Sequence, residues 1–112
     1  MDACLARLEE LMTHGKAYQE EGLSLTSLAS TVGVSSHQLS ELINTRLGIG
    51  FSKYVRESRV RAAKALLMSA PARSILSIGM DVGFRSQSAF YAAFKEVTGQ
   101  SPGDYRRSPT PD

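Results

Sequence analysis

The chain has 112 residues, of which 42% are hydrophobic and 21% are charged, and its formal net charge is +2. This length suits one compact domain or two very small ones. The sequence contains no run of about 18 apolar residues and no charged-then-apolar leader, so we expect neither a membrane span nor secretion. Cys4 is the single cysteine, which excludes an intrachain disulfide and favours a cytoplasmic location.

The charge is unevenly divided along the chain. Residues 1–50 carry three basic and six acidic side chains, a net charge of −3, whereas residues 51–112 carry ten basic and five acidic ones, a net charge of +5. A basic segment next to an acidic one is a weak indication of a polyanionic partner. Histidine and cysteine do not cluster, so we predict no metal site, and we expect no cofactor.

The opening segment has the pattern of an amphipathic helix that ends near Gly15. Its apolar residues recur at three- and four-residue spacing, at Leu5, Leu8, Leu11 and Met12. This apolar stripe needs a cover, either from the rest of this domain or from an upstream one. We assign residues 1–21 to a helix and linker that follow an upstream domain.

Two short helices are expected next, and their ends carry typical capping residues. Ser24 is the expected N-cap of a helix through Thr31, and Gly33 is placed to take the left-handed backbone conformation at the turn. Ser35 starts the following helix, and Gln38 three residues later completes a capping box. The expected buried positions are Leu25, Leu28, Val32, Leu39, Leu42 and Ile43.

A long helix is expected over residues 51–69, closed by Pro71. At about 1.5 Å per residue, it measures roughly 28 Å. We expect a single apolar stripe along it, formed by Phe51, Tyr54, Val55, Ala62, Ala65 and Leu66. The opposite face is basic, and we interpret Arg59 as structural, paired with an acid such as Asp81.

The rest of the chain repeats the first half. Ser74 and Ser86 are the expected N-caps of two more short helices, and Ser101 followed by Pro102 starts a final one. The expected buried residues are Ile75, Ile78, Val82, Phe84, Phe90, Ala93, Phe94 and Tyr105. We expect residues 108–112 to be disordered. No segment resembles a strand, so the predicted fold class is all-α with about seven helices.

The two halves match residue by residue. Gly33 and Gly83 lie 50 positions apart, and Ser35 and Ser86 lie 51 apart, so one residue has been inserted in the turn. Helices tolerate no such insertion, because it would rotate their buried face.

The repeat predicts two helix-turn-helix units, residues 22–69 with the connecting helix and residues 70–107, each a homeodomain-like three-helix subdomain. Such units need a small residue where the two helices cross, a role that we assign to Ala29 and Gly79.

This arrangement favours DNA as the ligand. In a helix-turn-helix, the first helix supports a second, the recognition helix, whose outer face enters the major groove. Two units joined by a helix of roughly 28 Å would suit successive major grooves, which repeat about every 34 Å. We therefore predict sequence-specific binding of double-stranded DNA by a monomer. The alternative is a helix-turn-helix fold used as a protein-interaction module, because the N-terminal half is acidic. No constellation favours an enzyme, and we predict no catalytic residues.

The sequence resembles the C-terminal DNA-binding domain of the AraC/XylS family of bacterial transcription regulators over about residues 22 to 107. The residues that carry the resemblance are Leu28, Ala29, Gly33, Ser35, Leu39, Ser40, Arg59, Ala62, Leu66, Leu67, Ser74, Ile75, Gly83, Phe84, Arg85, Ser86, Gln87, Ser88, Phe90, Phe94, Lys95, Gly99, Ser101, Pro102, Tyr105 and Arg106. The chain departs from the family pattern at Gly79, where alanine is usual, and at Glu41 and Asn44, where basic residues are frequent.

The resemblance has consequences for function. It implies transcription regulation, with promoter or operator DNA as the partner and RNA polymerase as a further candidate partner. It implies no membrane contact by this segment. Because family members usually carry a separate sensor or dimerisation domain, we expect this chain to be the C-terminal fragment of a longer regulator.

The outward positions of the two recognition helices supply the candidate base contacts, because their polar side chains can reach base edges. These candidates are Ser36, His37, Ser40, Glu41, Asn44, Gln87, Ser88 and Tyr91. The candidate phosphate contacts are Lys53, Arg56, Lys64, Arg85, Ser86, Lys95 and Arg106. For each residue the alternative is a position on a solvated polar or basic face.

Overall fold

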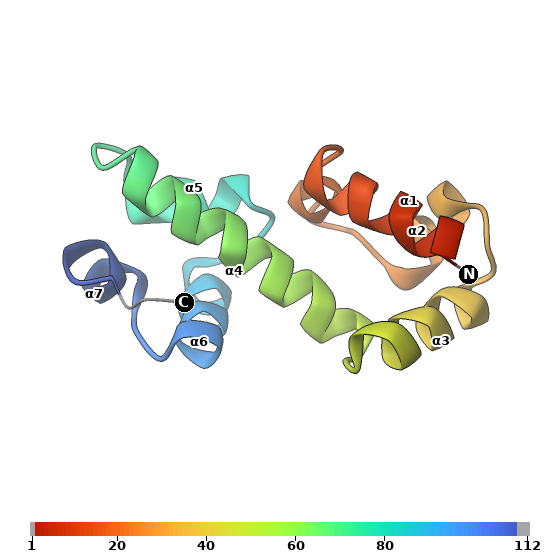
Figure 1. The fold of residues 1–112 in the computed structure, drawn as a ribbon. Helices are drawn as coiled ribbons and strands as arrows, with labels where there is room; N and C mark the ends of the chain where they lie inside the picture. Colours follow the sequence, from red (N-terminus) through yellow and green to blue (C-terminus); the bar gives the residue numbers. More distant parts are fainter. Residues whose placement is uncertain (1, 110–112) are drawn as a thin grey trace. The chain divides into compact units, whose positions relative to one another are not determined.

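The computed structural model describes residues 2–109, which form helices and contain no strand. The elements are α1 (Asp2–Thr13), the 3-10 helix η1 (Ala17–Gln19), α2 (Leu25–Val32), α3 (Ser36–Leu47), α4 (Phe51–Ser69), α5 (Ile75–Asp81), α6 (Gln87–Thr98) and α7 (Pro102–Arg107) (Figure 1). The predicted all-α fold class is confirmed, whereas η1 was not predicted. None of the described helices is both long and apolar enough to cross a membrane. The expected disorder at residues 110–112 lies outside the described residues.

The chain divides into two compact units, Met1–Val55 and Arg56–Asp112. The boundary falls inside α4, so the first turn of this helix belongs to the first unit and the remainder to the second. The sequence pattern had suggested a boundary after residue 69, at the end of the same helix.

In the first unit, helices α1, α2 and α3 share one apolar core with the beginning of α4. The buried residues of this core are Leu8, Met12, Leu28, Ala29, Val32, Leu39, Leu42, Ile43 and Val55. The stripe of α1 is therefore covered by the unit that contains it. Arg7 of α1 also donates from Nη2 to the carbonyl oxygen of Thr31 in α2, at 3.2 Å. Burial against the same core raises the pKa of the Tyr18 phenol.

The ends of α2 and α3 carry the caps that the sequence predicted. The Ser35 hydroxyl accepts a hydrogen bond from the Gln38 amide at 3.1 Å, and the Gln38 side chain accepts one from the Ser35 amide at 2.9 Å. Ser24 caps α2 in the same way, by accepting from the Ser27 amide. Gly33 has a φ of +95°, in the left-handed region that favours glycine. The predicted capping box and turn are therefore confirmed.

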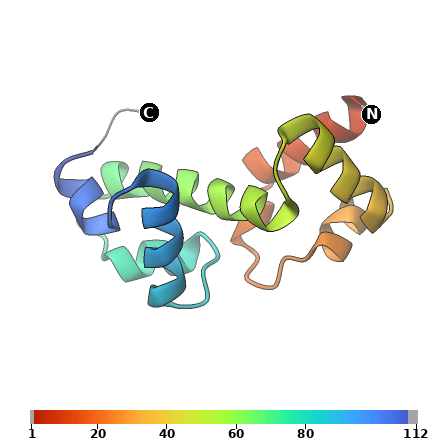
Figure 2. The same cartoon turned by 90° about the horizontal axis from the view of Figure 1, so that it is seen from below.

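In the second unit, α6 packs against α5 and α7 (Figure 1 and Figure 2). Each of these three helices begins after a serine whose hydroxyl accepts from the backbone three residues later: Ser74, Ser86 and Ser101. The buried apolar side chains of these helices and of the turn between α5 and α6 are Ile78, Val82, Phe84, Phe90, Ala93, Phe94, Pro102 and Tyr105. Of the eight expected buried residues, seven are buried and Ile75 is half-buried.

The repeat is visible in the structure as well as in the sequence. Residues 21–32 and 71–82 follow the same order of exposed, half-buried and buried positions. Beyond them, the Val34 amide donates to the Ala29 carbonyl, as the Phe84 amide does to Gly79, so the offset of 50 still holds there. Since the N-caps Ser35 and Ser86 differ by 51, the inserted residue is Arg85.

The predicted apolar stripe of α4 is wrong in its second half. Ala65 is exposed and Ala62 and Leu66 are only half-buried, whereas Val60, Ala63 and Leu67 are fully buried. The buried positions change register because the two ends of α4 belong to different units. A single stripe of helical period cannot describe a helix that serves two cores.

Gly79 explains how α5 approaches α6 so closely. A Cβ atom at this position would lie 2.5 Å from Cδ2 and 2.7 Å from Cγ of Phe90. The ring of Phe90 is fully buried and also contacts Phe84 and Phe94, with centroid distances of 5.2 and 5.8 Å. The ring therefore occupies the space that an alanine methyl group would need.

We expect Gly79→Ala to destabilise the chain. Alanine gains about 1 kcal/mol of helix propensity over glycine, but overpacking against a ring held on several sides costs roughly 1–3 kcal/mol. Chemical denaturation of Gly79→Ala, Phe90→Leu and the double variant measures the coupling, and the double variant should cost less than the sum of the single ones. Gly22→Ala, which meets no atom within 4 Å, is the control. A rise in stability for Gly79→Ala would contradict the close approach.

Candidate nucleic-acid interface

The outer face of α3 is set by its buried seam. Leu39, Leu42 and Ile43 point into the first core, so the residues between them face outward. His37, Glu41 and Asn44 are exposed, and Ser36 and Ser40 are half-buried, so all five predicted base-contact candidates on α3 reach the surface.

The side chains of this face also contact one another. Nε2 of His37 lies 3.7 Å from Oε2 of Glu41, one helical turn later, with 88% and 66% of the two side chains exposed. The side-chain amide of Asn44 donates from Nδ2 to the backbone carbonyl oxygen of Ser40 at 3.0 Å. These contacts are local and solvent-accessible, so they leave the carboxylate and the amide able to exchange partners with a ligand.

The outer face of α6 is assembled in the same way. Phe90, Ala93 and Phe94 are buried. Gln87 and Ser88 in the first turn are exposed, whereas Tyr91 is half-buried, and its ring lies edge-on to that of Phe90 at 6.0 Å. This face carries no acidic side chain in its first two turns, in contrast to that of α3.

The predicted phosphate contacts fall into two groups. Lys53, Arg85 and Lys95 are exposed, as is Ser86, whose hydroxyl caps α6 by accepting from the Ala89 amide at 3.1 Å. The other three are half-buried and contact groups of the second unit. Arg56 forms an ion pair with Glu96 at 3.1 Å, and the Lys64 ammonium lies 5.7 Å from the centre of the Tyr105 ring.

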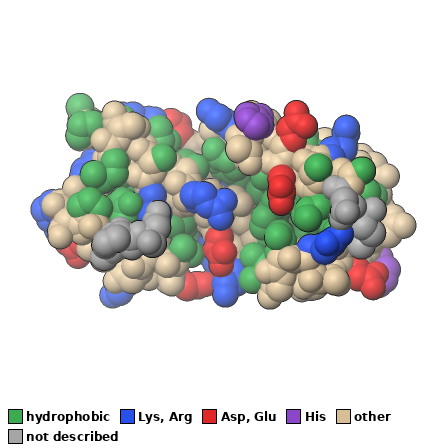
Figure 3. Space-filling model, in the orientation of Figure 1, with side chains coloured by type: hydrophobic (Ala, Val, Ile, Leu, Met, Phe, Trp, Pro, Cys, Tyr) green, Lys and Arg blue, Asp and Glu red, His purple; other side chains and the backbone are tan. Residues whose placement is uncertain are grey.

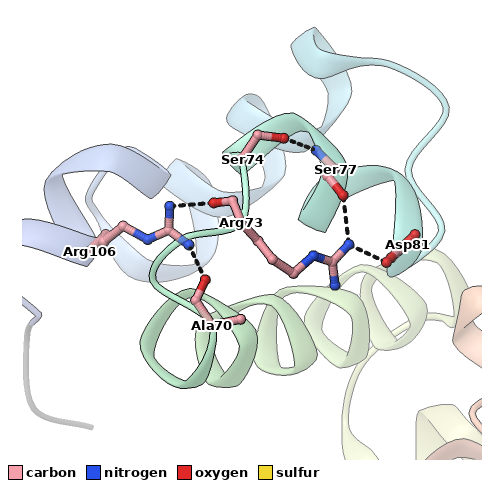
Figure 4. A network of polar contacts seen from close by, with 6 residues as sticks. All are labelled: Ala70, Arg73, Ser74, Ser77, Asp81 and Arg106. Carbon is pink, nitrogen blue, oxygen red and sulfur yellow. Dashed lines mark hydrogen bonds and ion pairs between the residues drawn. The ribbon is translucent and has the colours of Figure 1, made fainter.

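Arg106 is the third half-buried residue of this group. Its guanidinium donates hydrogen bonds to backbone carbonyl groups, as Figure 4 shows for Ala70 and Arg73. A further bond from Nε reaches Leu67 at 3.1 Å. Arg106 is half-buried by this arrangement. These contacts give it an internal role, and we leave it out of the interface proposed below.

Asp81, the acid suggested as an example of a partner for Arg59, binds Arg73. The Asp81 carboxylate forms an ion pair with Arg73, which also donates to the Ser77 hydroxyl at 2.6 Å (Figure 4). The Arg59 guanidinium lies over the Phe84 ring, 5.8 Å from its centre. Sequence reasoning missed Arg73, although its spacing of four from Ser77 and of eight from Asp81 is helical and was a usable signal.

Thr26 is a second residue that sequence reasoning missed. Its hydroxyl oxygen accepts a hydrogen bond from the Ser36 hydroxyl at 3.3 Å, so the first turns of α2 and α3 lie together. Thr26 is exposed, two positions after the N-cap of α2. Its position in the first turn of the supporting helix was the available signal.

The charge on the surface is mixed. On the face shown in Figure 3, acidic and basic side chains are interspersed and form no single basic patch. Among the residues that the structure describes, no three His, Cys, Asp or Glu side chains come together in a group that could hold a metal ion. The geometry thus offers two exposed polar helix faces, whose chemistry is hydrogen bonding with a few added cations.

The two capped pairs α2–α3 and α5–α6 define a helix-turn-helix protein. A family model described as a helix-turn-helix domain matches residues 28–108. The chain belongs to this family, in its AraC-type form.

Several known proteins are similar to the chain. The HTH-type transcriptional regulator GlxA of Rhizobium meliloti is 39% identical over 105 residues, which cover 94% of this chain and 31% of that protein. The C-terminal domain of the response regulator AraT from Geobacillus stearothermophilus is 30% identical, with a TM-score of 0.83 over 100% of this chain and 89% of that one. A transcriptional regulator from Chromobacterium violaceum, described as one of the AraC-type DNA-binding domain-containing proteins, is 32% identical. Its structure matches with a TM-score of 0.78 over 98% of this chain and 100% of that one. The chain thus spans about a third of the length of its curated relative.

We expect Ser86→Ala to destabilise the second unit by about 1 kcal/mol, because the start of α6 loses the acceptor for its Ala89 amide. Ser88→Ala, in the first turn of the same helix, makes the same chemical change at an exposed position and serves as the control. Thermal unfolding measures both variants. Equal melting temperatures would contradict the capping role of Ser86.

Proposed function

We propose that this chain binds double-stranded DNA sequence-specifically and thereby regulates transcription, with α3 and α6 as the recognition helices. The observation that carries the proposal is the duplicated geometry. Each unit supports a capped helix on a buried seam and leaves its opposite face exposed and polar, which is how a helix-turn-helix presents side chains to the major groove.

The names of similar proteins support the same function. The similar Chromobacterium protein is titled as containing an AraC-type DNA-binding domain, and the similar Rhizobium protein is named a transcriptional regulator. Because this chain spans 31% of the Rhizobium protein, we infer that it is the DNA-binding part of a longer regulator. RNA polymerase is a further candidate partner of this regulator.

Binding by one copy of the chain would occupy a long, asymmetric site. The 19 residues of α4 correspond to roughly 28 Å at the usual helical rise, close to the spacing of about 34 Å between successive major grooves. One recognition helix would then enter each groove. We place this activity in the cytoplasm, where a bacterial regulator meets its DNA.

The side chains divide by chemistry into base readers and phosphate contacts. The Gln87 amide matches the donor and acceptor of adenine, and the Glu41 carboxylate can accept from cytosine. The other base-contact candidates on these faces are Ser36, His37, Ser40, Asn44, Ser88 and Tyr91. Phosphate contacts are assigned to Lys53, Arg85, Ser86 and Lys95, which are exposed, and to Arg56 and Lys64 where DNA competes with their internal partners.

Salt dependence and base preference test this proposal together. Sites are first selected from random duplexes, and fluorescence anisotropy then measures affinity against salt concentration. We expect Gln87→Ala to relax the preference at one base pair by roughly 1–3 kcal/mol. Lys95→Ala should instead weaken all sequences alike and reduce the salt slope by about 1. Arg107→Ala, which removes an exposed charge held by Asp104 of its own helix, is the control.

Binding that does not weaken with salt, or no duplex binding at all, would contradict the proposed function and favour a protein-interaction module. Binding that is unaffected by both substitutions would contradict only the residue assignments.

Replacing Glu41 is expected to have two separate effects, one on non-specific affinity and one on base preference. Its carboxylate repels phosphates, so Glu41→Gln should raise affinity for duplexes that lack the selected site. The same change should shift the preferred base from cytosine towards adenine, because an amide replaces a pure acceptor. Competition between matched duplexes measures both effects. Glu9→Gln on α1 removes the same charge from an exposed position outside α3. An unchanged preference would remove Glu41 from the base readers.

A further inference from the structure

One side chain of α7 binds the backbone at three separate points. The Arg106 guanidinium donates from Nε to Leu67 at 3.1 Å, from Nη1 to Arg73 at 2.8 Å and from Nη2 to Ala70 at 3.1 Å. Leu67 lies in the last turn of α4, Ala70 directly follows α4, and Arg73 directly precedes the N-cap of α5. Arg106 therefore ties α7 to the end of α4 and to the loop that leads into α5.

The three acceptors suit an arginine and no other residue. The last carbonyl groups of a helix have no partner within the helix, and a cation near them is favoured by the helix dipole. The planar guanidinium presents its donors in a fixed fork, whereas a lysine ammonium is a single point of charge. Loss of the Arg106 fork would leave part-buried carbonyl groups without their partner.

The contacts continue from Arg73 along α5 (Figure 4). The carbonyl group of Arg73 accepts from Arg106, while its guanidinium donates to Ser77 and pairs with Asp81, the last residue of α5. A helix of seven residues is not stable by itself, so α5 depends on such external contacts. Arg106 is thereby connected to the residue at which the turn into α6 begins.

Helix α6 rests on the two elements that Arg106 holds together. On one side Phe90 packs against Gly79 of α5, and on the other Phe94 packs edge-on against Tyr105 of α7, with ring centroids 5.5 Å apart. We propose that Arg106 is a positioning residue for the second recognition helix. By fixing α7 to the loop before α5, it holds in place the two helices against which α6 packs. This inference rests on the function proposed above.

The first unit shows that this position does not require a charge. Position 106 corresponds to position 55 by the offset of 51, and position 73 corresponds to position 23 by the offset of 50. Val55 is part of the first core, and Leu23 packs against that core. Apolar contact in the first unit is thus replaced by the Arg106 and Arg73 contacts in the second.

Arg106→Met and Arg107→Met form a matched pair in the full chain. Both remove one positive charge from neighbouring residues of α7, but the Arg107 side chain is 74% exposed and pairs with Asp104 of the same helix. Affinities are measured for the selected duplex and for duplexes altered at the base pair assigned to Gln87 or at those assigned to α3. We expect Arg106→Met to reduce discrimination at the Gln87 pair by about tenfold, to retain discrimination at the α3 pairs and to leave the salt slope unchanged. Arg107→Met should behave as the parent chain does.

Arg106→Lys keeps the charge but loses the planar guanidinium, so it tests the positioning role if Arg106→Met does not fold. The proposal predicts the same selective loss at the Gln87 pair for the lysine variant. A salt slope reduced by about 1 in Arg106→Met, with discrimination retained at both ends, would make Arg106 a phosphate contact and overturn the proposal. An equal loss at both ends, in step with the fraction unfolded, would leave it a purely structural residue and also overturn it. Absence of duplex binding by the parent chain would overturn the proposed function as well, whereas normal binding with unaffected variants overturns this inference alone.

Discussion

The close approach of each supporting helix to its recognition helix is the constraint on which the rest of the fold depends. In the second unit the approach is limited by the ring of Phe90, which fills the space of a Cβ atom at Gly79. The corresponding residues of the first unit, Ala29 and Leu39, are both buried in its core. At the crossing, the first unit therefore combines alanine with leucine, whereas the second combines the smaller glycine with the larger phenylalanine. The departure from the usual alanine is thus compensated within the same seam, and glycine at position 79 reflects packing.

Features encoded by neighbouring residues could be predicted from the sequence. The serine caps, the capping box at Ser35 and the left-handed turn at Gly33 each depend on residues within four positions of one another. The outward faces of α3 and α6 follow from the same helical period, and the side chains assigned to these faces are exposed or half-buried in the structure. Local patterns were sufficient for all of these because each one is satisfied by a single helix and its ends.

Features that depend on distant partners could not be predicted in this way. The carbonyl groups bound by Arg106 lie 33 to 39 residues earlier in the chain, and a backbone acceptor leaves no trace in side-chain identity. A basic residue near the chain end therefore suggested a phosphate contact. The stripe of α4 failed for a related reason, because a periodic pattern assumes one core and this helix contributes to two. In both cases the missing information is which other segment faces the residue.

The repeat preserves the buried positions that support the recognition helices, but not the side chains on the outer faces of these helices. Residues 21–32 and 71–82 share one burial pattern, yet α3 presents a His37–Glu41 pair where α6 presents uncharged side chains preceded by the inserted Arg85. Buried positions are constrained by packing, whereas exposed ones are free to diverge at small cost in stability. A protein with two equal faces would favour a repeated DNA site. With a carboxylate on one face and an added guanidinium before the other, the two faces differ in charge as well as in the hydrogen-bonding groups that they expose. Under the proposed function, the two faces would match different base sequences, and this difference would give a single chain a defined orientation on DNA.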